Sequence, residues 1–256
     1  MLSRQFVINA FTGKGFRGNP AAVCVLQDWP DDTWLQATAR DNALSETAFL
    51  VREAAGYRLR WFTPTAEVRL CGHATLATAH VLYTLLGCSA PGVSFMTLSG
   101  ELGVSRLGQD EYRLDFPARF AQAIATPPAL AAALGATPLE VLETDVYLAV
   151  FADEAQIRAL RPDMAALQAL PRRAVIVTAP GRTADFVSRY FAPRMGVPED
   201  PVTGSAHCVL TPFWGARLGK TTLQAQQLSE RGGELRCEWD GDRVGLCGRA
   251  AAAHDN

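Results

Sequence analysis

Two distant segments of this 256-residue chain follow one plan. Residues 61–82 read WFTPTAEVRLCGHATLATAHVL, and residues 190–214 read YFAPRMGVPEDPVTGSAHCVLTPFW. Each starts with an aromatic residue, Phe, one further residue and Pro, and crosses an irregular stretch with one or two acids. Each then reaches a glycine, a polar residue and alanine ahead of an apolar helix. Because a repeated plan indicates a repeated unit of structure, we expect two similar domains.

The rest of the sequence predicts short strands with few helices. RQFVINAF and AAVCVL are typical of strands that flank a glycine-rich loop, and VSFMTL, LGVSRL and YRLDF are typical of antiparallel sheet. Prolines interrupt the pattern over residues 117–128 and mark a domain boundary. We therefore expect an α+β fold with a first domain over 1–117 and a second over 118–256. The last strand, 243–250, is a candidate to complete the first domain.

Composition excludes several classes of partner. The net charge is −2 and no basic block occurs, so neither nucleic acid nor an anionic membrane is an expected partner. The longest apolar run, ATLATAHVLYTLL, is too short and too polar to span a bilayer. The first residues lack a signal-peptide core, and we expect a cytoplasmic location.

Motifs for metals and nucleotides are missing from the sequence. Six cysteines include no CxxC pair, and four histidines show no metal-ligand spacing. No P-loop or GxSxG motif occurs. The sequence therefore predicts a protein that needs neither a metal nor an organic cofactor.

The two glycine-led helix starts have a chemical use. A helix N-terminus offers unpaired N–H groups and the positive end of a dipole. Gly72 and Gly204 let the backbone approach a ligand, so two starts facing each other would hold a small carboxylate. The alternative is that both glycines only allow tight turns into buried helices. The second helix start leaves a similar choice open. Its N-terminus is capped by Thr203, Ser205 or Asp200, or else Asp200 and Ser205 face the ligand.

Glu46 and His73 are the candidates for proton transfer. Glu46 lies where a helix gives way to a strand, in LSETAFL, where apolar neighbours would raise its pKa toward that of a general base. The alternative is an ordinary surface glutamate. His73 lies in a first helical turn, where the dipole disfavours its charged form and a buried ring is not expected. A surface cap is its alternative. We expect His80 in the core, and His207 either beside the site or in the core.

Five segments together resemble the PhzF-like phenazine-biosynthesis protein family, in its order and spacing. They are FTGKGFRGNPAAV, SETAF, EVRLCGHATLATA, DPVTGSAHC and LSERGGEL, and they run from residue 11 to 235. The resemblance implies a diaminopimelate-epimerase-like fold of two α+β domains, each a curved, mostly antiparallel sheet around a central helix. It also implies homodimers, and cofactor-free isomerases that move a proton on a small carboxylic or amino acid in the cleft between the domains.

The resemblance also assigns roles. It makes Glu46 the acid/base, with His73 and Asp200 as the other catalytic residues. It implies a substrate-binding set of Ser45, Gly72, Gly204 and Ser205. Cys71 stands where related epimerases carry one of two catalytic cysteines, but Pro201 stands at the matching place, so two-cysteine racemisation is not expected. A cysteine-assisted epimerase and a non-catalytic small-acid binding protein remain as alternatives.

Overall fold

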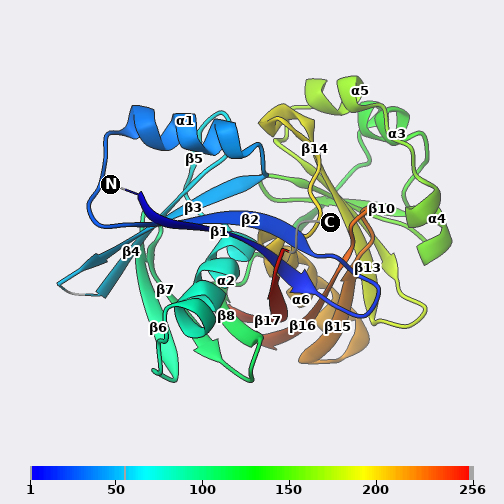
Figure 1. Ribbon diagram of the computed structural model, residues 1–256. Helices are drawn as coiled ribbons and strands as arrows, with labels where there is room; N and C mark the ends of the chain where they lie inside the picture. The colour runs from blue at the N-terminus through cyan, green and yellow to red at the C-terminus, as the bar shows by residue number, and fades with distance from the viewer. Residues whose placement is uncertain (1, 55, 254–256) are drawn as a thin grey trace. The chain divides into compact units, whose positions relative to one another are not determined.

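The structure is a computed structural model that describes residues 2–54 and 56–253. The chain divides into two compact units, each with strands and helices (Figure 1). Unit 1 takes in Met1–Phe116 and Gly245–Asn256, and unit 2 takes in Pro117–Val244. The last strand, β17 (Arg243–Ala252), thus lies almost wholly in unit 1, far along the chain from the strands that it joins.

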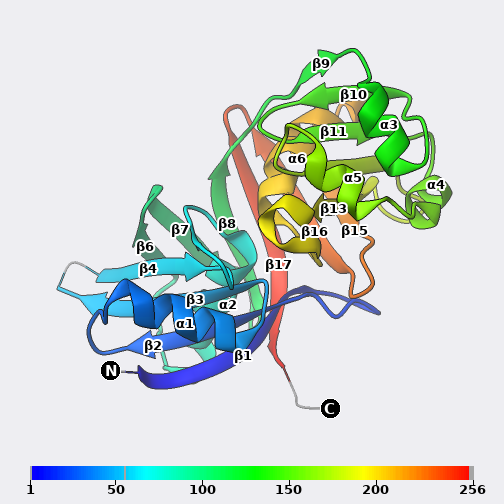
Figure 2. The ribbon, with the colours of Figure 1, turned by 90° about the horizontal axis from the view of Figure 1, so that it is seen from above.

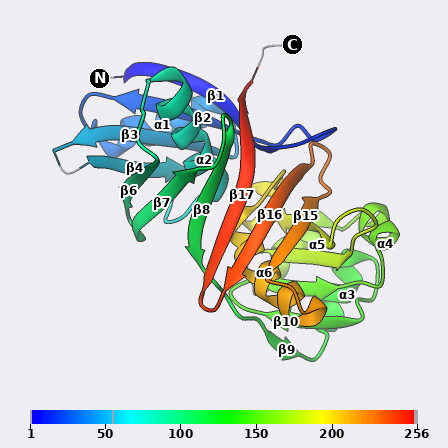
Figure 3. The same cartoon turned by 90° about the horizontal axis from the view of Figure 1, so that it is seen from below.

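Unit 1 is a mostly antiparallel sheet built around one buried helix. The central helix α2 (Gly72–His80) is buried at every residue and contacts three of the strands (Figure 1). Strand β17 pairs with both the first and the last strand of the N-terminal series, and Figure 3 shows it beside β8. The other elements are β1 (Leu2–Thr12), β2 (Asn19–Leu26), α1 (Asp32–Asn42), β3 (Glu46–Glu53), β4 (Gly56–Phe62), β5 (Glu67–Val68), β6 (Gly92–Thr97), β7 (Gly100–Arg106) and β8 (Glu111–Pro117).

Unit 2 repeats this construction around its own helix, α6 (Gly204–Leu218), which runs on through Pro212. This helix is mostly buried and contacts β15 and β16 (Figure 2). The elements are β9 (Gln122–Ile124), α3 (Pro128–Leu134), β10 (Glu140–Glu143), β11 (Tyr147–Val150), α4 (Glu154–Ala159), α5 (Met164–Ala169), β12 (Val175–Pro180), β13 (Phe186–Ala192), β14 (Val197–Glu199), β15 (Thr222–Gln227) and β16 (Gly233–Asp240).

The two units share one strand topology. In unit 1, β1–β2 is antiparallel, β2–β3 parallel, β3–β4 and β4–β5 antiparallel, β4–β6 parallel and β6–β7 antiparallel. In unit 2, the series from β10 to β16 has the same six relations in the same order. Helix α2 follows β5, and α6 follows β14. The prediction of two similar α+β domains, drawn from the repeated segments, is confirmed.

An equivalent ion pair in each unit holds the short strand that precedes the central helix. Arg60 binds Glu67 through Nε and Nη2 at 2.7 and 2.8 Å, and Arg189 binds Glu199 through the same atoms at 2.8 and 2.9 Å. Each guanidinium also lies over the phenylalanine ring two residues further along the chain, at 5.1 and 4.8 Å from the ring centroid. Two-pronged pairs of this kind fix geometry as well as adding energy. They hold β5 and β14, the short strands that lead the chain to the two helix starts.

The helix that begins at Gly72 changes character part of the way along. It is α-helical to His80 and continues as a π-helical turn over Val81–Leu85. The hydroxyl of Thr84 donates to the carbonyl oxygen of His80 at 2.6 Å, which is the kind of side-chain bond that competes with regular helix pairing. In the described part of the chain, no helix has the length and apolar character needed to cross a membrane.

Candidate active site

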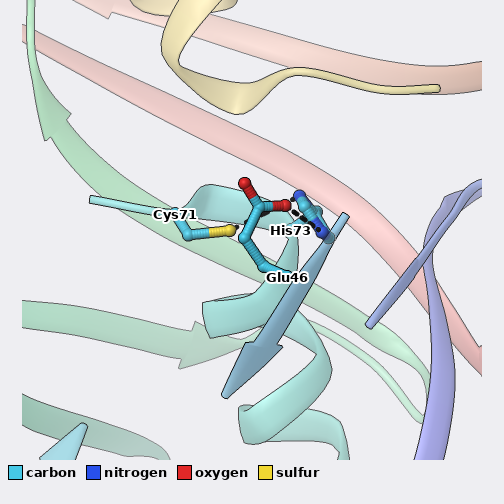
Figure 4. Close-up of side chains that lie close together, drawn as sticks. All are labelled: Glu46, Cys71 and His73. Carbon is cyan, nitrogen blue, oxygen red and sulfur yellow. Dashed lines mark hydrogen bonds and ion pairs between the residues drawn. The ribbon is translucent and has the colours of Figure 1, made fainter. Parts of the chain in front are cut away.

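Three polar side chains meet at the start of α2 (Figure 4). Glu46 is the first residue of β3, Cys71 is the residue that precedes α2, and His73 lies in the first helical turn. The His73 Nε2 lies 3.3 Å from the Glu46 Oε2, and the His73 Nδ1 lies 3.5 Å from the Cys71 sulfur. In Figure 4 one carboxylate oxygen of Glu46 turns toward the ring and the other turns away. The fold thus joins a carboxylate, a thiol and an imidazole from two segments.

A fourth residue, Asn19, fixes which nitrogen of His73 carries the proton. Asn19 begins β2, is fully buried, and places its Nδ2 3.2 Å from the His73 Nδ1. An amide nitrogen only donates, so in this orientation of the amide the Nδ1 accepts and the proton of the neutral ring is on Nε2. That proton is on the nitrogen nearer the Glu46 carboxylate, 3.3 Å from Oε2, although the contact lacks the geometry of a hydrogen bond.

Burial keeps His73 neutral. The residue is 3% exposed, and burial lowers its pKa to about 3. The expectation that a ring at this position would not be buried was wrong, because Asn19 and Cys71 supply polar partners inside the unit. The expectation that the charged form of His73 is disfavoured is confirmed. The cause is the loss of hydration on burial, where the sequence had suggested the helix dipole. The Glu46 side chain keeps 17% of its surface exposed, so it is partly shielded from water.

The two central helices begin without a side-chain cap, unlike three of the outer helices. Asp31, Asp153 and Asp163 each accept a hydrogen bond from a first-turn N–H of α1, α4 and α5. Cys71 and Thr203 stand at the same position before α2 and α6, and neither side chain makes such a bond. Both of these helix starts are therefore suited to an anion supplied from outside the helix.

The glycines at these starts are not required by backbone conformation. Gly72 and Gly204 are the first helical residues of α2 and α6, both are buried, and neither has a positive φ. A left-handed turn, the usual reason for a glycine, is thus not the reason here. A side-chain-free surface over the helix start is the remaining physical advantage.

Asp200 and Thr203 form a second polar cluster, at the start of α6 in unit 2. The Thr203 hydroxyl donates to the Asp200 Oδ2 at 2.5 Å. Gln227, which is fully buried, accepts from the Thr203 N–H at 2.9 Å and donates to the Asp200 carbonyl oxygen at 2.7 Å. Ser205, the second residue of α6, is partly buried. Gln227 therefore fixes the segment that carries Asp200 and Ser205.

The predicted site residues fall into two groups, one in each unit. Glu46, Gly72 and His73 gather at the start of α2, with the partly buried Ser45 next in the chain to Glu46. The group at the start of α6 consists of Asp200, Gly204 and Ser205.

The other two described histidines lie in the cores of their units. The expectation for His80 is confirmed, since its ring is buried with Nδ1 3.1 Å from the Tyr112 hydroxyl. His207 is fully buried, places Nδ1 2.8 Å from the Thr203 carbonyl oxygen and packs on Phe186. Burial lowers the pKa of His207 to about 4, so this ring is also neutral near pH 7.

Sequence reasoning missed two positioning residues and a possible set of metal ligands. Asn19 lies in the FRGNPAAV segment, and Gln227 directly precedes LSERGGEL, so polar residues at the edges of recognised motifs were the available signal. Donor atoms of Glu46, Cys71 and His73 lie within 4.8 Å of one another and could hold a metal ion. Glu46 comes from a different segment, so a search for ligand spacing could not find this group.

Comparison with known proteins identifies the family. Residues 8–255 match the PhzC-PhzF family, described as phenazine biosynthesis-like protein. Two proteins of Pseudomonas aeruginosa named as isomerases are 55% and 51% identical, over 96% and 95% of this chain and 95% and 93% of their own lengths.

Comparison with solved structures identifies the same family and its fold. A PhzF-family phenazine biosynthesis protein from Enterococcus faecalis is 45% identical with a TM-score of 0.93, covering 98% of this chain and 96% of that one. A hydroxyproline epimerase from Agrobacterium vitis shares the fold, at 11% identity and a TM-score of 0.63, over 99% of this chain and 92% of its own. The chain therefore belongs to the phenazine biosynthesis-like (PhzC-PhzF) protein family, has its diaminopimelate-epimerase-like fold, and is an isomerase of that family.

Proposed function

We propose that this isomerase moves a proton between two carbons of a small carboxylic acid, with Glu46 as the acid/base and without a cofactor. The observation that carries the proposal is the Glu46–His73 arrangement. A partly shielded carboxylate lies 3.3 Å from a neutral, buried imidazole, beside a helix start that no side chain caps. A general base needs a positioned lone pair and a nearby means of stabilising the charge that forms on the substrate.

The chemistry follows from these groups. The Glu46 carboxylate takes a proton from an activated C–H bond, and the electron pair left behind spreads into the substrate's unsaturated or carboxylate group. The resulting carboxylic acid returns the proton at a second carbon, so the product is an isomer and no redox partner is needed. His73 limits the positions open to the carboxylate, since its Nε2 lies 3.3 Å from the Glu46 Oε2. The first helical hydrogen bond of α2 runs from Thr75 to Cys71, which leaves earlier N–H groups of that turn to stabilise the anion.

In this proposal the second cluster holds the same molecule. Asp200 would orient a polar group of the substrate, and Ser205 with the N–H groups of α6 would bind its carboxylate. A test of that joint action is a pair of variants, Glu46→Gln and Ser205→Ala. The first should lower turnover, and the second should mainly raise KM. If Ser205→Ala changed neither constant, α6 would not be part of the site.

A cysteine-assisted epimerase is the second candidate, favoured by the 3.5 Å contact between Cys71 and His73. Racemisation by two bases needs an acid and a base on opposite faces of one carbon. Neither Pro201, where the resemblance expects the second cysteine, nor Thr203, which stands before α6 as Cys71 does before α2, is a cysteine. The proton-moving isomerase therefore agrees better with the sequence of this chain.

The test uses solvent deuterium. Small aromatic, cyclohexadienyl and amino acids are first ranked by thermal shift, since a ligand that binds only the folded chain stabilises it. The binders are then incubated in D2O and examined for deuterium in the recovered acid. Glu46→Gln should lower the exchange rate by about 10²–10⁴-fold, the usual contribution of a general base, with little change in the thermal shift.

Cys71→Ala is the matched comparison and should retain most of the exchange. If Glu46→Gln remained active and Cys71→Ala were inactive, the role of acid/base would belong to the Cys71 thiol. An acid that binds but neither takes up deuterium nor is converted to an isomer, with any variant, would identify a binding protein instead of an isomerase.

A further inference from the structure

Glu46, Cys71 and His73 offer three different donor types at one point in unit 1. Their ligand atoms lie within 4.8 Å of one another, with 3.3 Å between the carboxylate and Nε2 and 3.5 Å between the sulfur and Nδ1. Ligand atoms around a tetrahedral zinc ion are about 3.5 Å apart, given bond lengths of about 2.0–2.3 Å. The carboxylate lies nearest Nε2 and the sulfur nearest Nδ1, so an ion on Nε2 requires the Cys71 side chain to move toward that nitrogen.

The donor set selects the kind of ion. Thiolate, imidazole and carboxylate together match Zn²⁺, whereas Mg²⁺ and Ca²⁺ prefer sites made of oxygen alone. Three protein ligands leave a fourth position open to water or to a small anion. On coordination the thiol loses its proton to solvent, so two negative ligands balance the two charges of the ion. That balance matters because Cys71 and His73 are 6% and 3% exposed, and a buried net charge is costly.

The surroundings supply an outer partner for the imidazole. With the ion on Nε2, the nitrogen nearer Glu46, the ring proton moves to Nδ1, which faces the Asn19 amide at 3.2 Å. A half-turn of that amide presents its oxygen to the Nδ1 proton. Metal-bound histidines usually donate their second N–H to such a partner, and loss of that partner weakens metal binding about 10–100-fold.

We propose that the chain binds one Zn²⁺ ion through Glu46, Cys71 and His73, and that the bound ion stops proton transfer. The second half rests on the proposed function, because a carboxylate that coordinates zinc no longer has the lone pair that would accept the substrate proton. The isomerase is then active as the metal-free protein and is reversibly inhibited by zinc, which a chelator removes.

The binding experiment needs no substrate. The full chain is freed of metal with a chelator and titrated with Co²⁺, a spectroscopic stand-in for Zn²⁺, while absorption is recorded. We expect saturation at one ion per chain, a thiolate-to-cobalt band in the near ultraviolet, and loss of the band when Zn²⁺ is added. Cys71→Ala should abolish the band, and Glu46→Gln and Asn19→Ala should weaken the affinity, the latter by about 10–100-fold.

Cys88→Ala is the control, because Cys88 is the more exposed thiol of unit 1 and would be the site of non-specific binding. It should leave the band unchanged. Absence of saturable binding, a band that survives Cys71→Ala, or a band that disappears in Cys88→Ala with the fold intact by circular dichroism, would each overturn the site. Binding without inhibition of deuterium exchange would preserve the zinc site and remove Glu46 as the base, so the two proposals fail separately.

Discussion

Gln227 is expected to be the residue on which the start of α6 most depends. Its side chain is fully buried and bridges the Thr203 N–H, the Thr203 hydroxyl and the Asp200 carbonyl oxygen, at 2.9, 3.1 and 2.7 Å. Gln227→Leu keeps the size of the side chain but leaves two backbone groups without this partner. Each unpaired buried group costs about 1–3 kcal/mol, so the free energy of unfolding should fall by about 2–6 kcal/mol.

The measurement combines global and local stability. Urea unfolding gives the change in free energy, and the thermal midpoint should fall by roughly 4–24 °C, from about 2–4 °C per kcal/mol for a chain of this size. Hydrogen exchange of residues 200–207, read by mass spectrometry, should show faster exchange there than elsewhere in unit 2. That local loss separates the role of Gln227 in holding α6 from a general weakening.

Gln224→Leu is the matched control, on the same strand but with an exposed side chain. Its free energy of unfolding should stay within about 0.5 kcal/mol of the original, as for most surface changes. If Gln227→Leu were equally mild and exchange at 200–207 were unchanged, the bridging hydrogen bonds would not be what holds the α6 start.

Two further predictions concern stability. A Cβ at Gly248 would lie 2.3 Å from Cδ1 of the fully buried Phe11, so Gly248→Ala should destabilise by about 1–3 kcal/mol in urea unfolding, whereas Gly103→Ala, with no atom within 4 Å, should not. Burial lowers the pKa of His73 and His207 to about 3 and about 4, against about 6.5 in the unfolded chain. Above about pH 6.5 neither the folded nor the unfolded chain binds a proton at these rings. Between that pH and the pKa of the folded state, only the unfolded chain binds it. The free energy of unfolding should therefore fall between about pH 6.5 and 4, by up to about 1.4 kcal/mol per pH unit for each histidine, and His207→Asn should remove its share of that slope.

The sequence was most informative where structure is local. The strands at RQFVINAF and AAVCVL and the helix led by Gly204 each follow from a pattern within one short segment. The two-domain plan follows from the likeness of two such segments. Strands β5 and β14 were missed because two or three residues carry no period of their own. They exist because an arginine on the preceding strand binds their glutamates.

The candidate site was predicted in composition but not in environment. Glu46 and His73 were named from their motifs, yet the burial of His73 depends on Asn19, which is 54 residues away in the sequence. Gln227 is 27 residues away from Asp200, and neither contact leaves a periodic signal in the chain. Long-range hydrogen bonds of this kind decide whether a polar residue is buried and neutral or exposed and charged, and only the folded chain shows them.

Strand β17 has a consequence for the order in which the molecule is made. It pairs with β1 and β8, yet all of unit 2 is encoded between β8 and β17. As the chain leaves the ribosome, unit 2 has its whole sequence available while unit 1 still lacks a strand. Until β17 emerges, the backbone groups of β1 and β8 that will pair with it have no partner there, and open strands of this kind invite pairing with other chains. Synthesis of β17 is therefore the event that permits closure of the first unit, although the synthesis of that unit begins before that of unit 2.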